Sequence, residues 1–182
     1  MAVVVRECSK LAQIEHNEMH DNVARYIHCQ LCRLERASSW YEQEPKGVVE
    51  SQNSKRLWEF TVQCARKIES RRPDTVFIDS KEREVVIIGV ALPGDDRVKD
   101  KEFEKVEKYR LLIDEIANVW HTRKVILVLV AIGALEAVSV KFKKYMKQIG
   151  VKVTLEVIQK TALLGKAQIV KKYCPCKKKE ET

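Results

Sequence analysis

The sequence predicts an α/β protein in which a central mixed sheet is flanked by helices, with further helices toward both ends of the chain. Two β-branched runs, residues 75–78 and 85–88, enclose a charged turn, which is the pattern of a strand hairpin. The charged segment at residues 98–121 has helical periodicity. Residues 124–130 then form a continuous apolar strand, typical of a sheet covered on both faces. This order of elements favours one α/β domain.

The composition indicates a folded, basic protein. The chain has 182 residues, of which 45% are hydrophobic and 33% are charged, and its net charge is +8. We expect one domain at residues 1–173 and a basic disordered tail at residues 174–182. The apolar run at residues 125–135 is too short to cross a membrane, and the first residues do not have the pattern of a signal peptide. A nuclear or cytoplasmic, non-secreted protein is therefore expected.

Several further elements are predicted from local patterns. Apolar residues at helical spacing predict a long helix at about residues 9–36. An irregular strand, interrupted at Pro45 and Gly47, is expected over residues 40–50, and alternation predicts a strand at residues 55–67. Residues 133–150 read as a basic amphipathic helix and residues 155–170 as a final helix or helix pair. In the helix at 98–121 the predicted apolar stripe consists of Phe103, Val106, Tyr109, Leu112, Ile113, Ile116 and Trp120.

Basic side chains gather in residues 141–147 and near the C-terminal end. Such charge attracts polyanions, chiefly nucleic acid, through phosphate contacts and counterion release. A surface that only keeps the protein in solution is the alternative interpretation. DNA is the expected partner, with RNA as the second choice. The candidate nucleic-acid-binding residues are Arg71, Arg72, Arg97, Lys141, Lys143, Lys144 and Lys147.

Cys29 and Cys32 have the spacing of half a zinc site, and histidines lie nearby in the sequence. Both cysteines fall inside a predicted helix, however, and no second cysteine pair has matching spacing. Without a secretory signal the six cysteines are expected to be reduced. We therefore favour buried or incidental thiols over a zinc site.

The hairpin is the place where chemistry is expected. Metal-dependent phosphodiester hydrolysis uses two carboxylates to hold Mg²⁺ and a lysine to orient the attacking water or stabilise the developing charge. Asp74 begins the first strand and position 89 closes the second, so the two positions should lie side by side. Lys105 and Lys108 on the following helix can point toward them. Position 89 is a glycine, which offers no ligand.

Four stretches in fixed order carry a resemblance to a known family. They are HDNVARYIH at 20–28, the hairpin region at 72–109 (RPD, then IIGVALPGD, then EKVEKY), GAL at 133–135, and QKTALLG at 159–165. Together they resemble the restriction-like endonuclease region at the C-terminal end of non-LTR retrotransposon polyproteins. The resemblance implies a restriction-endonuclease-like (PD-D/E-x-K) fold, DNA nicking with Mg²⁺ or Mn²⁺, and an adjoining reverse transcriptase in the parent element.

Carried over residue by residue, the resemblance places Asp74 at the first catalytic, metal-binding acid. Lys105 or Lys108 falls at the catalytic lysine on the helix, and Gly89 falls at the second acid. We therefore expect a degenerate nuclease domain that retains nucleic-acid binding. Without the resemblance, Asp74 is explained as a residue that opens a strand and bonds a backbone N–H.

Two alternatives remain open at this point. One is an active nicking enzyme with a substitute acid, for which Asp95 or Asp96 on the next loop is available. Asp79 lies at the far end of its strand, about 16 Å from Asp74 at strand rise, and the earlier segment offers Glu42, Glu44 and Glu50. The other alternative is a non-catalytic protein-interaction domain.

Overall fold

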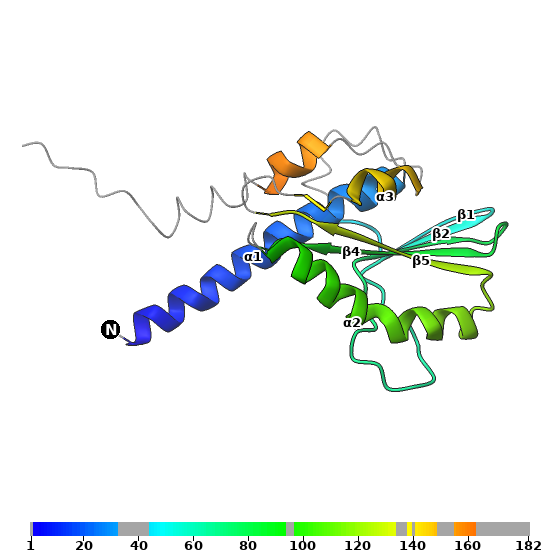
Figure 1. The fold of residues 1–182 in the computed structure, drawn as a ribbon, viewed down its shortest axis with the longest axis horizontal. Helices are drawn as coiled ribbons and strands as arrows, with labels where there is room; N and C mark the ends of the chain where they lie inside the picture. Colours follow the sequence, from blue (N-terminus) through cyan, green and yellow to red (C-terminus); the bar gives the residue numbers. More distant parts are fainter. Residues whose placement is uncertain are drawn as a thin grey trace, which may run out of the picture.

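The protein is built on a five-stranded mixed sheet. The computed structural model describes residues 2–32, 44–93, 97–133, 138–139, 141–148 and 155–162. Its named elements are α1 (Ala2–Leu31), β1 (Val48–Ser51), β2 (Ser54–Trp58), β3 (Thr75–Asp79), β4 (Glu84–Ala91), α2 (Val98–Val119), β5 (Lys124–Ala131) and α3 (Phe142–Gln148). The strands lie in chain order; β4 and β5 are parallel, and the other neighbours are antiparallel. The predicted α/β class, with helices flanking a mixed sheet, is confirmed (Figure 1).

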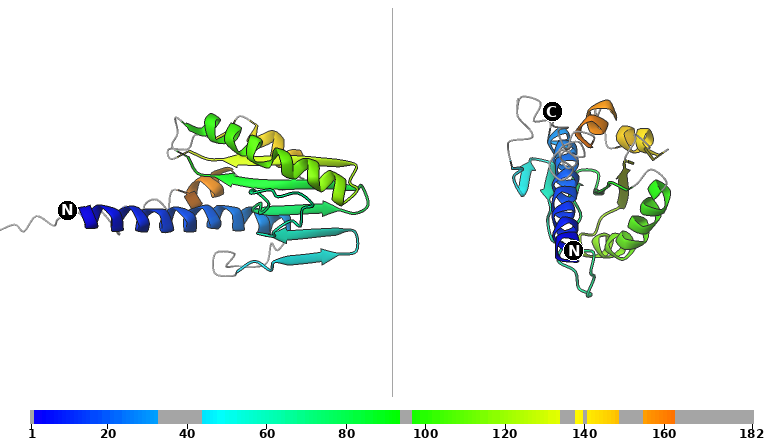
Figure 2. Two further views of the ribbon diagram at one scale, coloured as in Figure 1. Left: turned by 90° about the horizontal axis from the view of Figure 1, so that it is seen from below. Right: turned by 90° about the vertical axis from the view of Figure 1, so that its left-hand side faces the viewer.

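Helices cover both faces of the sheet (Figures 1 and 2). α1, α3 and the helical residues 155–162 lie on one face, where Ile27 and Val90 belong to one buried cluster. α2 lies on the other face, where Ile87 and Leu112 belong to a second cluster. Because successive side chains of a strand point to opposite faces, β4 and β5 contribute to both clusters. The N-terminal half of α1 extends beyond the sheet (Figure 2).

The predicted hairpin of β3 and β4 is confirmed, and its register positions the candidate site. Thr75 pairs with Ile88 in the antiparallel ladder. One further step along this register places Asp74 opposite Gly89, as the sequence predicts. β4 does not end there, however, because its pairing with β5 continues as far as Ala91.

β5 and α2 agree with the predicted strand and helix, with two corrections. β5 is covered on both faces as predicted, yet among the described strands it occupies an edge of the sheet. The apolar stripe of α2 is wrong at its N-terminal end, where Phe103 is 67% exposed. The helix contacts the sheet through later residues such as Tyr109 and Ile116, which are 1% and 0% exposed.

Two further bounds differ from prediction. α1 starts at Ala2 and continues without a break to Leu31, where a helix at 9–36 was expected. β2 ends at Trp58 although alternation favoured a strand to residue 67. The cause of the second difference is Glu59, whose φ of 43° takes the backbone out of the extended conformation. The chain beyond it forms a loop that is closed by the Val62 N–H donating to the Arg71 carbonyl at 2.8 Å.

The predicted helix at 133–150 is much shorter, because α3 begins only at Phe142. Among the described residues before it, Ile132 and Val138 form an antiparallel bridge, and the Ser139 N–H donates to the Ala131 carbonyl. Helical residues 155–162 agree with the start of the predicted final helix. The rest of that helix and the basic tail lie outside the described residues. Among the described helices, none has the length and apolar character needed to span a bilayer.

Docking of α1 on β4 is tested by shortening a side chain at their interface. Ile27→Ala should lower the free energy of unfolding by about 2–5 kcal/mol because Ile27 is fully buried there. Ile14→Ala on the same helix is the matched control, since Ile14 is 53% exposed, and its effect should stay below about 0.5 kcal/mol. Denaturant unfolding measures both; equal effects would contradict the placement of α1.

Candidate functional site

Asp74 lies directly before β3 and is largely buried, with 15% of its side chain exposed. Two residues further along the chain, Val76 belongs to the cluster on the α2 face, so alternation directs Asp74 to that same face. The Val90 N–H of β4 donates a hydrogen bond of 2.6 Å to Asp74 Oδ2. Burial alone raises the pKa of this carboxyl, but His20, Lys105 and the Val90 N–H together hold it below its usual value. Asp74 is therefore a carboxylate in the folded protein.

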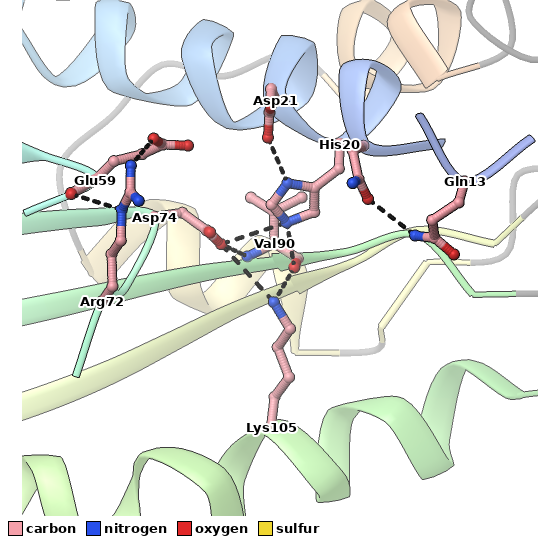
Figure 3. Close-up of polar contacts among 9 residues, drawn as sticks. Gln13, His20, Asp21, Glu59, Arg72, Asp74, Val90 and Lys105 are labelled. Atoms are coloured by element: carbon pink, nitrogen blue, oxygen red, sulfur yellow. Dashed lines mark hydrogen bonds and ion pairs between the residues drawn. The ribbon is translucent and has the colours of Figure 1, made fainter. Parts of the chain in front are cut away.

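Two cationic side chains approach this carboxylate from opposite faces of the sheet (Figure 3). His20 Nε2, from α1, lies 3.6 Å from Asp74 Oδ2, and Lys105 Nζ, from α2, lies 3.8 Å from the same oxygen. Both nitrogens also contact the Val90 carbonyl, His20 at 3.0 Å and Lys105 through a hydrogen bond. Three segments that are distant in the sequence thus meet at the peptide groups of Val90.

His20 is placed to carry a proton on each ring nitrogen. Its Nδ1 lies 3.0 Å from Asp21 Oδ1, and its Nε2 faces the Val90 carbonyl and Asp74, so each nitrogen meets an acceptor. Burial lowers the pKa of His20 and Lys105 opposes its charge, yet the hydrogen bond and charge of Asp74, together with Asp21, raise the pKa to about 9. His20 is therefore an imidazolium at neutral pH.

Lys105 is held at the site although burial disfavours its charge. Its side chain is 20% exposed, and burial lowers its pKa more than Asp74 raises it, with Lys108 and Lys101 adding repulsion. The cluster places the Asp74 carboxylate between the His20 imidazolium and the Lys105 amine, and Asp21 lies at its outer side. The cluster is neutralised from within the protein.

Position 89 is enclosed by core side chains as well as being a glycine. A Cβ atom placed there would lie 3.1 Å from Leu129 Cδ2, 3.1 Å from Tyr109 Cε2 and 3.7 Å from Lys105 Cδ. Leu129 and Tyr109 are 2% and 1% exposed, so neither has open space to move into. The place of the second acid is thus filled by the core between α2 and β5.

The residues at the site do not fit the magnesium ion that the resemblance implies. Mg²⁺ requires near-octahedral oxygen coordination and is usually held by carboxylates. Asp74 is the carboxylate here, its Oδ2 is already bonded to the Val90 N–H, and Val90 O is occupied by His20 and Lys105. Within the described part of the chain no three His, Cys, Asp or Glu side chains are grouped as metal ligands.

The cysteine pair of α1 lies apart from Asp74, beside a buried histidine. Cys32 Sγ lies 3.5 Å from His28 Nε2, and Cys29 is 8% exposed. Burial raises the pKa of Cys29, and it raises that of Cys32 to about 11 although Arg56 opposes the change. Both side chains are therefore protonated thiols at neutral pH.

The structure brings only some of the predicted residues to Asp74. Of the two candidate lysines, Lys105 reaches it and Lys108 does not; Lys108 Nζ lies 5.7 Å from the Tyr109 ring instead. Asp79 lies at the opposite end of β3, as predicted. Asp95, the candidate substitute acid, is outside the described residues.

All seven predicted nucleic-acid-binding residues are exposed, and three of them are paired with a carboxylate. Arg72 is bonded to Glu59 at 2.5 Å, Arg97 lies 3.9 Å from Glu104, and Lys141 lies 3.3 Å from Glu102. The other four are Arg71 in the loop before β3 and, on α3, Lys143, Lys144 and Lys147.

His20 is the site residue that sequence reasoning missed. It opens the stretch at 20–28 that carries part of the family resemblance, and it follows His16 by one helical turn. His16 Nε2 lies 3.1 Å from the Leu92 carbonyl, so both histidines contact the end of β4. Two histidines at this spacing on an otherwise amphipathic helix were the available signal.

No family model and no curated protein matches the chain. What defines the molecule is therefore its own fold and site. It is an α/β protein with a carboxylate at a strand start that is held by a histidine from one face and a lysine from the other.

Crowding at position 89 makes a direct prediction. Gly89→Ala should lower the free energy of unfolding by about 1–3 kcal/mol because the new methyl group is forced against Leu129 and Tyr109. In the Leu129→Ala background, where Leu129 Cδ2 is absent, Gly89→Ala should lower the free energy of unfolding by less. Gly47→Ala is the control, because a Cβ there meets nothing within 4 Å. Unfolding curves that leave Gly89→Ala as stable as Gly47→Ala would contradict the packing described.

The two buried histidines predict a stability maximum near pH 6.5. His20 has its pKa raised from 6.5 to about 9, so its stabilisation is complete below pH 6.5 and is lost as the pH rises to 9. Burial, aided by Arg56, lowers the pKa of His28 to about 4, so its contribution is complete above pH 6.5 and is lost as the pH falls to 4. The change at His20 corresponds to at most about 3 kcal/mol.

Urea unfolding across pH 4–9 measures both effects. His20→Gln should flatten the alkaline side and leave the acid side, whereas His28→Gln should do the reverse. An alkaline side that is unaffected by His20→Gln would show that the ion pair with Asp74 does not stabilise the fold.

Proposed function

We propose that the chain is a nucleic-acid-binding domain with a restriction-endonuclease-like core that lacks an effective metal site. In this proposal it is related to the endonuclease region that its sequence resembles in non-LTR retrotransposon polyproteins. Its activity would then be binding to DNA, or to RNA, without phosphodiester cleavage. The parent element would have joined such a domain to a reverse transcriptase.

The single observation that carries the proposal is the placement of Asp74 and Lys105. An acid before β3 lies opposite position 89 of β4, and a lysine of the next helix reaches that acid at 3.8 Å. This is the arrangement that the resemblance implies for a nuclease, with one part replaced. Gly89 stands in place of the second acid, and His20 supplies a cation where a metal would be attracted to Asp74.

The loss of one acid argues against efficient cleavage. A metal ion in a nuclease neutralises charge that develops on the phosphate, and its removal costs several orders of magnitude in rate. Two other described carboxylates that could serve as ligands have partners of their own. Glu102 accepts a hydrogen bond from Ser139 at 2.9 Å and lies beside Lys141, and Glu50 pairs with Lys55 at 2.6 Å on β1 and β2.

Binding is supported by basic side chains outside the cluster. Three lysines of α3, Lys143, Lys144 and Lys147, are exposed on a helix whose apolar side packs into the core through Phe142 and Met146. Exposed ammonium groups contact phosphates at little desolvation cost, and each contact releases counterions. The net charge of +8 adds long-range attraction.

The binding proposal is tested by salt dependence. The triple variant Lys143→Gln, Lys144→Gln, Lys147→Gln should reduce the slope of log K against log salt for duplex DNA by about 2–3, since each lost phosphate contact removes about 0.9. The control triple variant loses the same charge at exposed lysines of other elements, by Lys67→Gln, Lys81→Gln and Lys124→Gln. Equal slopes for the two variants would contradict a role of α3, and no duplex binding by the native chain would overturn the proposal.

Cleavage is tested separately with supercoiled plasmid in Mg²⁺ or Mn²⁺. We expect no nicking above background by the native chain, and no difference for Asp74→Ala. Nicking that is lost in Asp74→Ala would identify the domain as an active metal-dependent endonuclease with a substitute acid.

A further inference from the structure

A cavity lies away from the Asp74 cluster, on the same face of the sheet as α2. Its volume is about 530 Å³, within the range of small-ligand sites. α2 crosses β4 and β5, so the α2 face of β1–β3 is left to the loop after β2 and to the end of α2. The cavity is lined by Val48, Glu50, Lys55, Leu57, Phe60, Ile78, Asp79, Ser80, Arg83, Trp120, His121 and Thr122.

The cavity has an apolar floor and aromatic walls. Leu57 and Ile78 line it from adjacent strands, and Phe60 and Trp120 line it as partly buried rings. A flat, apolar ring system has the shape and chemistry for such a space, because aromatic side chains stack with bases of any sequence.

The lining holds two cations and two carboxylates, of which Arg83 is the cation without a carboxylate partner. Lys55 is paired with Glu50, and Asp79 accepts the backbone N–H groups of Lys81 and Glu82. Arg83 donates a guanidinium hydrogen bond to the backbone carbonyl of His121, and no described carboxylate lies within ion-pair distance of it. The guanidinium therefore keeps its full charge at the mouth of an apolar cavity. A ligand with an aromatic ring and an attached anion matches both features.

The rim is also held in an unusual backbone conformation. Three non-glycine residues in the described chain have a positive φ, and two of them, Arg83 at 55° and His121 at 49°, line this cavity. The third, Glu59, directly precedes Phe60. The two rim turns are tied together by the Arg123 N–H donating to the Arg83 carbonyl at 2.7 Å. Such conformations persist where the surrounding structure fixes them and are common at binding sites.

From these features we infer that the cavity holds an unstacked base of single-stranded nucleic acid, with the base between Phe60 and Trp120 and the adjoining phosphate at Arg83. This inference rests on the proposed function and adds the form of nucleic acid that is recognised. Single-stranded segments can turn a base out of the stack at little cost, whereas a paired duplex cannot.

The test compares a fluorescent oligothymidylate with an abasic strand of the same length and phosphate charge, using fluorescence anisotropy. The native chain should bind oligothymidylate about tenfold more tightly than the abasic strand, because stacking is lost in the latter. Trp120→Ala should remove this difference and leave abasic binding unchanged. Ser80→Trp, at an exposed turn on the rim, should also remove the preference for oligothymidylate, because the larger side chain fills the mouth of the cavity. This second variant leaves the core intact and so provides the test if Trp120→Ala does not fold.

Phe103→Ala is the control, because it removes an exposed aromatic ring from α2 outside the cavity and should change nothing. Equal binding of both strands by the native chain, or an unchanged preference in folded Ser80→Trp, would overturn the inference. If duplex DNA still binds with a steep salt dependence in that case, the proposed nucleic-acid binding holds and only the base site in the cavity is wrong. If no nucleic acid binds, both the proposed function and the base site are wrong.

Discussion

The ionised carboxylate of Asp74 is the constraint on which the central architecture depends. It joins α1 through His20, β4 through the Val90 N–H and α2 through Lys105, so three segments distant in sequence are fixed at one point. A buried carboxylate is costly unless it is paired and hydrogen-bonded. Here His20 and Lys105 are themselves partly buried, at 21% and 20% exposure, so removal of any one leaves the others uncompensated. The charge balance of the site is therefore also a condition for the packing of the helices on the sheet.

Under the proposed function, the same balance would explain how the arrangement of a nuclease site persists without its metal chemistry. A cation attracted to Asp74 would compete with His20 and Lys105, which already contact both Asp74 Oδ2 and the Val90 carbonyl. The second acid position is closed by Leu129 and Tyr109. In our account the loss of the acid and the arrival of an internal cation belong together, because a lone Asp74 without a metal needs positive charge from the protein. The proposed nucleic-acid contacts therefore lie on the exposed basic surface and in the cavity beside Trp120.

Much of the fold could be predicted from local patterns, and the exceptions have physical causes. The hairpin and α2 carry strong periodicity, and the register that places Asp74 opposite Gly89 follows from the length of the turn between their strands. β2 was predicted too long because alternation in the sequence continues past Glu59, where the backbone leaves the extended region. Lys105 and Lys108 could not be separated by sequence alone, since both lie near the predicted stripe. His20 could not be found from the hairpin, because its contact with Asp74 depends on how a helix from the other face docks.

The most direct test of this account is an NMR titration of the imidazole nitrogens of His20, with and without Mg²⁺. The account predicts a doubly protonated ring with a pKa of about 9, unchanged by Mg²⁺ and lowered strongly in Asp74→Asn. A pKa near 6.5, or one that falls when Mg²⁺ is added, would contradict it. Such a result would mean that Asp74 is free to hold a metal ion and that His20 is not its partner.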